Sequence, residues 1–141
     1  MLETVEVPAA ALGGSGDRRN RALSALDQVG LADSRDQLAQ TLPSGLQRRL
    51  EIARMLPGRP LFLLLDEPTA GLNPDESQEL VEIVLALRLR YGCGVVIISH
   101  DLRVIMTACE RIVVLNEGRV IAEGDPEKVR HDPAVIRAYL G

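Results

Sequence analysis

Two apolar patterns alternate along the chain: helical spacing on one face, and short unbroken apolar runs. Apolar side chains three and four positions apart recur over residues 21–29, 46–56 and 74–91, and this spacing is typical of amphipathic helices. Gly30 and Gly92 follow two of these segments, as glycine commonly does at helix ends. The pattern therefore predicts three helices, each with one face toward a core.

Residues 61–65 and 95–98 are apolar at every position. Such runs are typical of strands that are buried on both faces of a parallel sheet. Two further apolar segments, 112–115 and 119–122, flank Asn116-Glu117-Gly118, which predicts a hairpin. Strands that alternate with helices in this order indicate an α/β fold.

The two ends of the chain differ in character. Residues 1–20 contain Pro8 and the run Gly13-Gly14-Ser15-Gly16, a composition that buries little and predicts a flexible lead-in. A short helix is expected over residues 102–108. Residues 126–141 are expected to form two short helices that separate near Asp132-Pro133.

Composition narrows the classes of protein that the chain can represent. Of its 141 residues, 46% are hydrophobic and 26% are charged, with a formal net charge of −4, which fits one soluble globular domain and excludes a disordered or collagen-like chain. The longest apolar run has five residues, against the roughly 20 of a membrane-spanning helix, and no secretion signal is expected at Met1. A pI near 5.2 argues against nucleic acid as a partner. Cys93 and Cys109 match no metal or redox spacing and are expected to be small buried residues.

Two adjacent acids, Asp66 and Glu67, directly follow the first apolar run. Ligands of open α/β sheets bind at the carboxyl ends of strands, and successive strand residues point to opposite faces. Asp66 is therefore a candidate for holding Mg²⁺ through a water molecule, and Glu67 for polarising an attacking water. The alternative, that both acids are exposed turn residues, stays open on this segment alone.

His100 stands at the end of the second predicted strand. A histidine there can hydrogen-bond a phosphate oxygen or orient a water, although a structural role is the commoner case. The order of segments strengthens the functional interpretation. A glycine-containing helix start, a strand ending in Asp-Glu, a Gly-Leu-Asn-Pro turn and a strand ending in Ser-His follow one another.

In this order residues 21–141 resemble the C-terminal part of an ABC transporter ATP-binding subunit. The matching motifs are a signature-like sequence and its continuation, a Walker B strand, a D-loop and a switch histidine, at Leu42-Pro43-Ser44-Gly45-Leu46, Gln47–Arg54, Asp66 with Glu67, Ala70–Pro74 and His100. Within the family, the continuation, the D-loop and the ending Asp132–Gly141 are most similar to branched-chain amino-acid importers.

The resemblance implies an α/β fold, namely a partial P-loop NTPase (RecA-like) nucleotide-binding domain that lacks the P-loop strand. Residues 21–58 would be part of the helical subdomain with the signature, and residues 59–141 the C-terminal part of the RecA-like lobe. In the family fold the P-loop strand lies between the strand that ends at His100 and the strand at 112–115. Without it, these two strands would expose unpaired edges or pair with each other.

The signature would lie at an ATP site between two subunits that pair head to tail. Ser44 and Gly45, at a helix N-terminus, would face the γ-phosphate of the partner's ATP, where backbone N–H groups and the helix dipole favour an anion. The family's usual motif is Leu-Ser-Gly-Gly-Gln, so Pro43 replaces a serine and Leu46 replaces a glutamine. Leu46 thereby removes a polar side chain near the neighbouring nucleotide.

The resemblance assigns roles to four further residues. Asp66 would serve the Mg²⁺ ion, and Glu67 would be the general base that acts on water. His100 would contact the γ-phosphate, and Asn73 would lie at the subunit boundary.

No P-loop motif, Gly-x-x-x-x-Gly-Lys-Ser/Thr, is present in the chain, and in that motif the lysine reaches the β- and γ-phosphates. Residues 13–19 are glycine-rich but contain no lysine, and the single lysine, Lys128, follows the predicted strands. The sequence therefore predicts a fragment of a longer subunit, from a truncated, split or mis-started reading frame, that is inactive alone.

By resemblance, the function is that of an ATP-hydrolysing, energy-coupling subunit of an ABC importer for branched-chain or other hydrophobic amino acids. Its partners would be a second ATP-binding subunit, transmembrane permease subunits and, indirectly, a solute-binding protein, which implies a cytoplasmic location on the inner face of the membrane. One alternative is a non-catalytic interaction module that presents the signature face to a P-loop-bearing partner. An ABC ATPase of DNA repair is disfavoured because residues 21–40 are too short for a coiled coil, and a helicase because basic charge and nucleic-acid motifs are missing.

Overall fold

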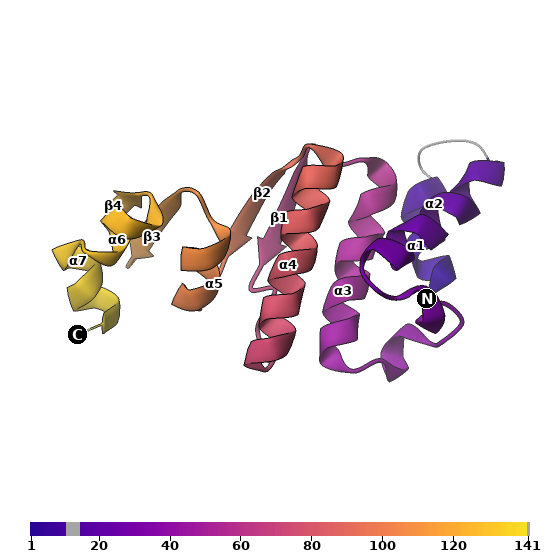
Figure 1. The fold of residues 1–141 in the computed structure, drawn as a ribbon, viewed down its shortest axis with the longest axis horizontal. Helices are drawn as coiled ribbons and strands as arrows, with labels where there is room; N and C mark the ends of the chain where they lie inside the picture. The colour runs from indigo at the N-terminus through magenta and orange to yellow at the C-terminus, as the bar shows by residue number, and fades with distance from the viewer. Residues whose placement is uncertain (11–14, 141) are drawn as a thin grey trace. The chain divides into compact units, whose positions relative to one another are not determined.

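The computed structural model describes residues 1–10 and 15–140, which fall into two compact units, Met1–Ile98 and Ser99–Gly141. Figure 1 labels α1–α7 and β1–β4. The first contains α1 (Leu2–Ala10), α2 (Ser15–Gln28), η1 (Ala32–Ser34), η2 (Ala39–Thr41), α3 (Ser44–Met55), η3 (Leu56–Gly58), β1 (Phe62–Asp66), α4 (Pro74–Tyr91) and β2 (Gly94–Ile98). The second contains α5 (Leu102–Ala108), β3 (Ile112–Asn116), β4 (Arg119–Gly124), α6 (Pro126–Arg130), α7 (Pro133–Val135) and η4 (Ile136–Leu140).

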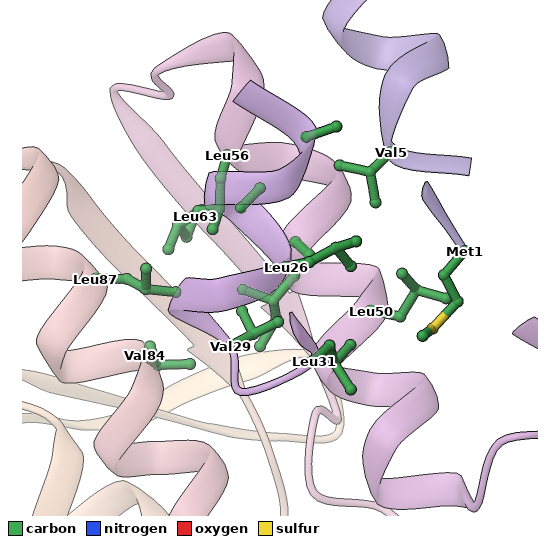
Figure 2. Packing of buried hydrophobic residues seen from close by; sticks show 14 of the residues in the cluster. Met1, Val5, Leu26, Val29, Leu31, Leu50, Leu56, Leu63, Val84 and Leu87 are labelled. Carbon is green, nitrogen blue, oxygen red and sulfur yellow. The ribbon is translucent and has the colours of Figure 1, made fainter. Parts of the chain in front are cut away.

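The three amphipathic helices predicted from apolar spacing correspond to α2, α3 and α4, and their apolar faces share one core. Figure 2 shows side chains of this cluster converging from α2, α3, α4 and β1. Leu26, Leu56 and Leu63 are at most 1% exposed. Burying an aliphatic side chain of this size contributes about 1.5–3 kcal/mol, so this core holds the first unit together.

The prediction of a flexible lead-in over residues 1–20 was wrong for the described part of that range. Residues 2–10 form α1, and α1 packs against α2 and α3. Val5 is fully buried, and the amino group of Met1 donates a hydrogen bond of 2.8 Å to the carbonyl of Gln37. The predicted glycine-rich stretch 13–16 lies partly outside the described residues. The small residues around Pro8 predicted a flexible segment, because they form little apolar surface by themselves. In the folded chain, neighbouring helices supply the apolar partners that α1 lacks by itself.

Strands β1 and β2 form a parallel pair in which Leu63 is in register with Val95 and Asp66 with Ile98. The prediction that both strands are buried on both faces was wrong. Burial alternates along β1, where Leu63 is fully buried and Leu64 is 69% exposed. One face packs on the core shared with α4, while the other face carries exposed apolar side chains, namely Phe62, Leu64, Val96 and Ile98.

The second unit contains the predicted hairpin. β3 and β4 pair antiparallel, with a register shift between Val114 and Leu115. Glu117 and Gly118 both have positive φ, 48° and 76°, as two-residue hairpin turns of the favoured hand require. Among the described strands, β3 pairs with β4 alone and β2 with β1 alone, so each of these two sheets has unpaired edges.

The predicted boundary between residues 58 and 59 falls inside the first unit. The division into a helical subdomain and an ATPase lobe stays a prediction. None of the helices in the described part of the chain combines the length and the apolar character that crossing a bilayer requires.

Helix α5 begins at a charged cap. The Asp101 carboxylate accepts a hydrogen bond of 2.9 Å from the Arg103 backbone N–H, and the Arg103 guanidinium lies 3.3 Å from the same carboxylate. The hydrogen bond from the Arg103 side chain holds the pKa of Asp101 below its ordinary value, against an opposing contribution from burial. Because the folded pKa is lowered, the stabilisation is present above the unfolded pKa and is lost as pH falls through the folded value.

We expect the two neighbouring leucines of β1 to differ sharply on truncation. Leu63→Ala should lower the free energy of unfolding by about 2–5 kcal/mol, because it opens a cavity in the core. Leu64→Ala should change it by less than about 0.5 kcal/mol. Urea unfolding followed by circular dichroism measures both, and equal losses would contradict the alternating burial of β1.

We expect Asp101→Asn to flatten the acid dependence of stability. Asparagine is also a good N-cap residue, so the variant keeps the cap but loses the charge that Arg103 stabilises. The natural chain should lose more stability than the variant as pH falls below about 3.9, the ordinary aspartate pKa. Urea titrations at neutral and acid pH compare the two, and parallel losses would show that Asp101 carries no linked stabilisation.

Candidate functional site

The two adjacent acids lie at the carboxyl edge of the parallel pair, as predicted. Asp66 is the last residue of β1 and is exposed, whereas Glu67 is half-buried. The Glu67 backbone N–H donates a hydrogen bond of 2.8 Å to the Ile98 carbonyl, which extends the ladder one residue beyond the strand. The pairing of β1 with β2 therefore fixes the backbone positions of Asp66 and Glu67.

Glu67 adopts a left-handed backbone conformation, with φ of 47°. For a residue other than glycine this conformation is strained, at about 1–3 kcal/mol, and such residues cluster at functional sites. The turn that holds it is well anchored, because Pro68 and Thr69 are buried and the Ala70 N–H donates to the Glu67 carbonyl at 3.1 Å. The alternative of two loosely exposed turn acids therefore does not describe Glu67.

The signature-like segment lies at the start of α3. Pro43 is the N-cap residue and provides no side-chain acceptor. The Gln47 N–H bonds the Pro43 carbonyl at 3.0 Å, so the N–H groups before it have no partner within the helix. Ser44 is exposed and Gly45 is buried. This helix start can accept an anion through its backbone N–H groups and its dipole.

The Leu46 side chain has a different role from the glutamine that the family's usual motif has at this position. Its side chain is half-buried and packs against the hydrophobic core cluster. This packing of Leu46 therefore stabilises the position of α3 on the core. Of Leu46, only the backbone N–H remains for contact with a phosphate. Its place among the nucleotide-contacting residues stays a prediction.

Asn73 is the N-cap residue of α4 and forms a capping box with Glu76. Its Oδ1 accepts the Glu76 N–H at 2.9 Å, and its own N–H donates to Glu76 Oε2 at 3.0 Å. The other carboxylate oxygen, Oε1, lies 3.3 Å from the point where a Cβ on Gly45 would stand. The structure thus brings Gly45 of the signature and Asn73 of the D-loop together through Glu76.

Glu76 was missed as a site residue by the sequence argument. The signal was present, because Asn73-Pro74-Asp75-Glu76 has the spacing of a capping box, with a cap residue followed three positions later by glutamate. The contact with Gly45 carried no sequence signal, since the two residues belong to different helices.

His100 belongs to the second unit, where it is exposed and directly precedes the cap residue Asp101. The Asp101 N–H donates a hydrogen bond of 3.1 Å to Ser99 Oγ. These interactions fix the turn that leads from His100 into α5. The contact of His100 with a phosphate stays a prediction.

Asp66 offers one exposed carboxylate, and no group of three or more potential ligands from His, Cys, Asp and Glu occurs within residues 1–10 and 15–140. Such a donor set does not fit a metal held by protein ligands alone. It does fit Mg²⁺, which keeps several waters and is bound through one or two carboxylates together with substrate phosphates.

Known families match both ends of the chain. The family described as "ABC transporter" matches residues 2–70, and the family described as "Branched-chain amino acid ATP-binding cassette transporter" matches residues 119–141. The first match begins within α1, so α1 is part of the family's sequence and not a lead-in to it.

Individual relatives agree with these matches. The high-affinity branched-chain amino acid transport ATP-binding protein LivG of Escherichia coli (strain K12) is 45% identical over 122 residues, which are 86% of this chain and 48% of LivG. BraF of Pseudomonas aeruginosa, described in the same words, is 46% identical over 116 residues, 82% of this chain and 46% of BraF. The chain spans about half the length of the curated relatives it matches.

A solved structure shares the fold. CbiO1 from Clostridium perfringens, part of an ABC transporter complex, superposes with a TM-score of 0.84 at 33% identity, over 94% of this chain and 53% of CbiO1. The α/β arrangement described above is accordingly part of an ABC nucleotide-binding domain. The chain therefore belongs to the ABC transporter ATP-binding family and resembles its branched-chain amino acid members.

Proposed function

We propose that the chain is the C-terminal part of an ATP-hydrolysing, energy-coupling subunit of an ABC importer for branched-chain or other hydrophobic amino acids. One observation carries this proposal: Glu67 is held in a strained conformation at the carboxyl edge of the β1–β2 pair, directly after Asp66. A catalytic base needs a fixed position relative to its water.

Asp66 and Glu67 would have different roles at the nucleotide. Asp66, exposed at the strand end, would hold Mg²⁺ through a water molecule. The ion, when bound, supplies positive charge to the phosphate oxygens. Glu67 would accept a proton from the attacking water at its carboxylate, and its anchored backbone would keep that oxygen in place. His100 would contact the γ-phosphate.

The α3 start would serve the nucleotide of a second subunit. Ser44 and Gly45 would present backbone N–H groups to its γ-phosphate, and the dipole of the 12-residue helix would favour that anion. Glu76 lies against Gly45, so a shift at the signature would reach Asn73 at the proposed subunit boundary. The likeness to LivG and BraF supports transmembrane permease subunits and a solute-binding protein as further partners, and a location on the cytoplasmic face of the membrane.

A second function, a non-catalytic interaction module, is favoured by a specific surface. Phe62, Leu64 and Ile98 are 61–69% exposed on the open face of the β1–β2 pair. Large contiguous apolar patches on a protein surface are typical of interaction sites. A separately encoded half that carries a P-loop would cover this face and supply the missing phosphate cradle, while this chain supplied the signature.

The chain alone should bind MgATP weakly or not at all, because its sequence contains no P-loop motif and hence no P-loop lysine, and the P-loop backbone and lysine supply most contacts to the β- and γ-phosphates. Adding an N-terminal half that carries a P-loop, by mixing or by fusion, should restore binding. Calorimetric titration of the chain, of the half and of the mixture measures this. A micromolar dissociation constant for the chain alone would contradict the prediction and point to a phosphate site elsewhere.

In the restored protein, Glu67→Gln should lower ATP turnover by about 10²–10⁴-fold and leave ATP binding intact, because the amide keeps the shape but cannot accept a proton. Phosphate release and equilibrium binding are measured on the same preparations. Full turnover by Glu67→Gln would show that Glu67 is not the base.

Asp66→Asn provides the matched comparison, since it removes one charge from the adjacent residue. It should weaken the Mg²⁺-dependent part of ATP binding, unlike Glu67→Gln. His100→Ala should lower turnover more than affinity. The contrast between the two acids separates the roles, because a merely structural pair would respond alike.

A further inference from the structure

A polar groove of about 520 Å³ lies in the first unit, apart from the strand ends and the α3 start. It is bounded by one face of α2, the segment after α3 and the end of α4, with the lining residues Asp17, Asn20, Arg21, Ser24, Gln28, Leu56, Pro57, Arg59, Arg90 and Tyr91. Neither the motifs nor the proposed function uses these side chains.

The α2 wall of the groove is a stripe of polar residues. Asp17, Arg21, Ser24 and Gln28 follow one another at helical spacing, which places them on one face. The opposite face of α2, which includes the fully buried Leu26, packs into the core. The groove wall is therefore rigid, because the core holds the helix that carries it.

Two donors of this wall remain available. Gln28 Nε2 donates to the Ser24 carbonyl at 2.9 Å and to Ser24 Oγ at 3.0 Å. The Ser24 hydroxyl thus accepts a hydrogen bond and keeps its own proton for another acceptor. Asn20 is exposed and adds an amide to the same wall.

The facing wall carries positive charge. Arg59 and Arg90 line the groove, and within the described part of the chain neither forms an ion pair. Arg59 stands in the left-handed region, with φ of 47° and ψ of 64°, and Pro60 after it restricts its backbone further. A glycine would adopt this backbone conformation at lower cost than an arginine. The glycine of this segment, however, is the preceding residue, Gly58.

The charges of the groove sum to a positive surplus. Asp17 is neutralised by its ion pair with Arg21, and the end of α4 contributes the negative pole of a helix dipole. Against these stand the two guanidinium groups of Arg59 and Arg90. The surplus occurs in a chain whose net charge is −4, so it is local to this groove.

We propose that this groove binds a small anion that carries phosphate or carboxylate groups. Arg59 and Arg90 supply the charge, and the Ser24 hydroxyl and Asn20 amide supply neutral donors. Guanidinium groups bind both kinds of oxyanion through paired N–H groups, so the shared chemistry is an oxyanion with two or more acceptor oxygens. The site is separate from the proposed ATP site and does not depend on it.

The test is calorimetric titration of the full chain with pyrophosphate and, separately, with citrate at low ionic strength. We expect a dissociation constant of roughly 1 mM or below for at least one probe, weakened by added salt. Binding of pyrophosphate alone identifies a phosphate site, and binding of citrate alone a carboxylate site. No binding of either probe overturns the proposal.

The groove variant Arg59→Gln with Arg90→Gln should raise the dissociation constant by about tenfold or more. The matched control, Arg119→Gln with Arg137→Gln, removes the same charge from two exposed positions of the second unit and should change it less than about twofold. Equal weakening by both variants would overturn the proposal, since it would show general charge attraction. Circular dichroism checks that both variants fold, and protection of Arg59 and Arg90 from phenylglyoxal by the bound probe gives a second readout.

Discussion

The parallel pairing of β1 with β2 is the constraint on which the candidate site depends. It places the carboxyl ends of two strands side by side, and its last hydrogen bond, from the Glu67 N–H to the Ile98 carbonyl, continues past the strand. That bond holds Glu67 in a conformation it would not adopt in a free chain. The buried face of β1, which includes Leu63, anchors the β1–β2 pair to the core. The positions of Asp66 and Glu67 therefore depend on this packing.

The start of α3 is tied to the start of α4 by a single glutamate. One oxygen of Glu76 completes the cap of α4 with Asn73, and the other lies against Gly45. A Cβ on Gly45 would stand 3.3 Å from that oxygen, a tight contact, so a larger residue there would displace the Glu76 carboxylate by a few tenths of an ångström. Two motifs that are separate in the sequence therefore share one contact, and the geometry of one constrains the other.

One face of the β1–β2 pair is open, and this is why the prediction of strands buried on both faces was wrong. Phe62 and Leu64 have the composition of a strand that is covered on both sides, yet they are more than 60% exposed. The chain spans about half the length of its relatives, and a sheet of the family's kind is buried on both faces. The apolar composition of the strand thus agrees with a covering layer on this face, which is what the proposed pairing with a P-loop-bearing half would provide.

Local periodicity and residues close together in the chain were enough to predict the helices α2, α3 and α4, the order of the strands along the chain, the hairpin at Glu117-Gly118 and the family. The same local patterns predicted Asp66 and Glu67 as site residues, and their roles stay predictions. Three features could be seen only in the folded chain: α1 is a packed helix, Leu46 packs against the core, and Glu76 joins Gly45 to Asn73. Each of these depends on a partner from a distant segment, and apolar spacing records that a face is buried but not what buries it.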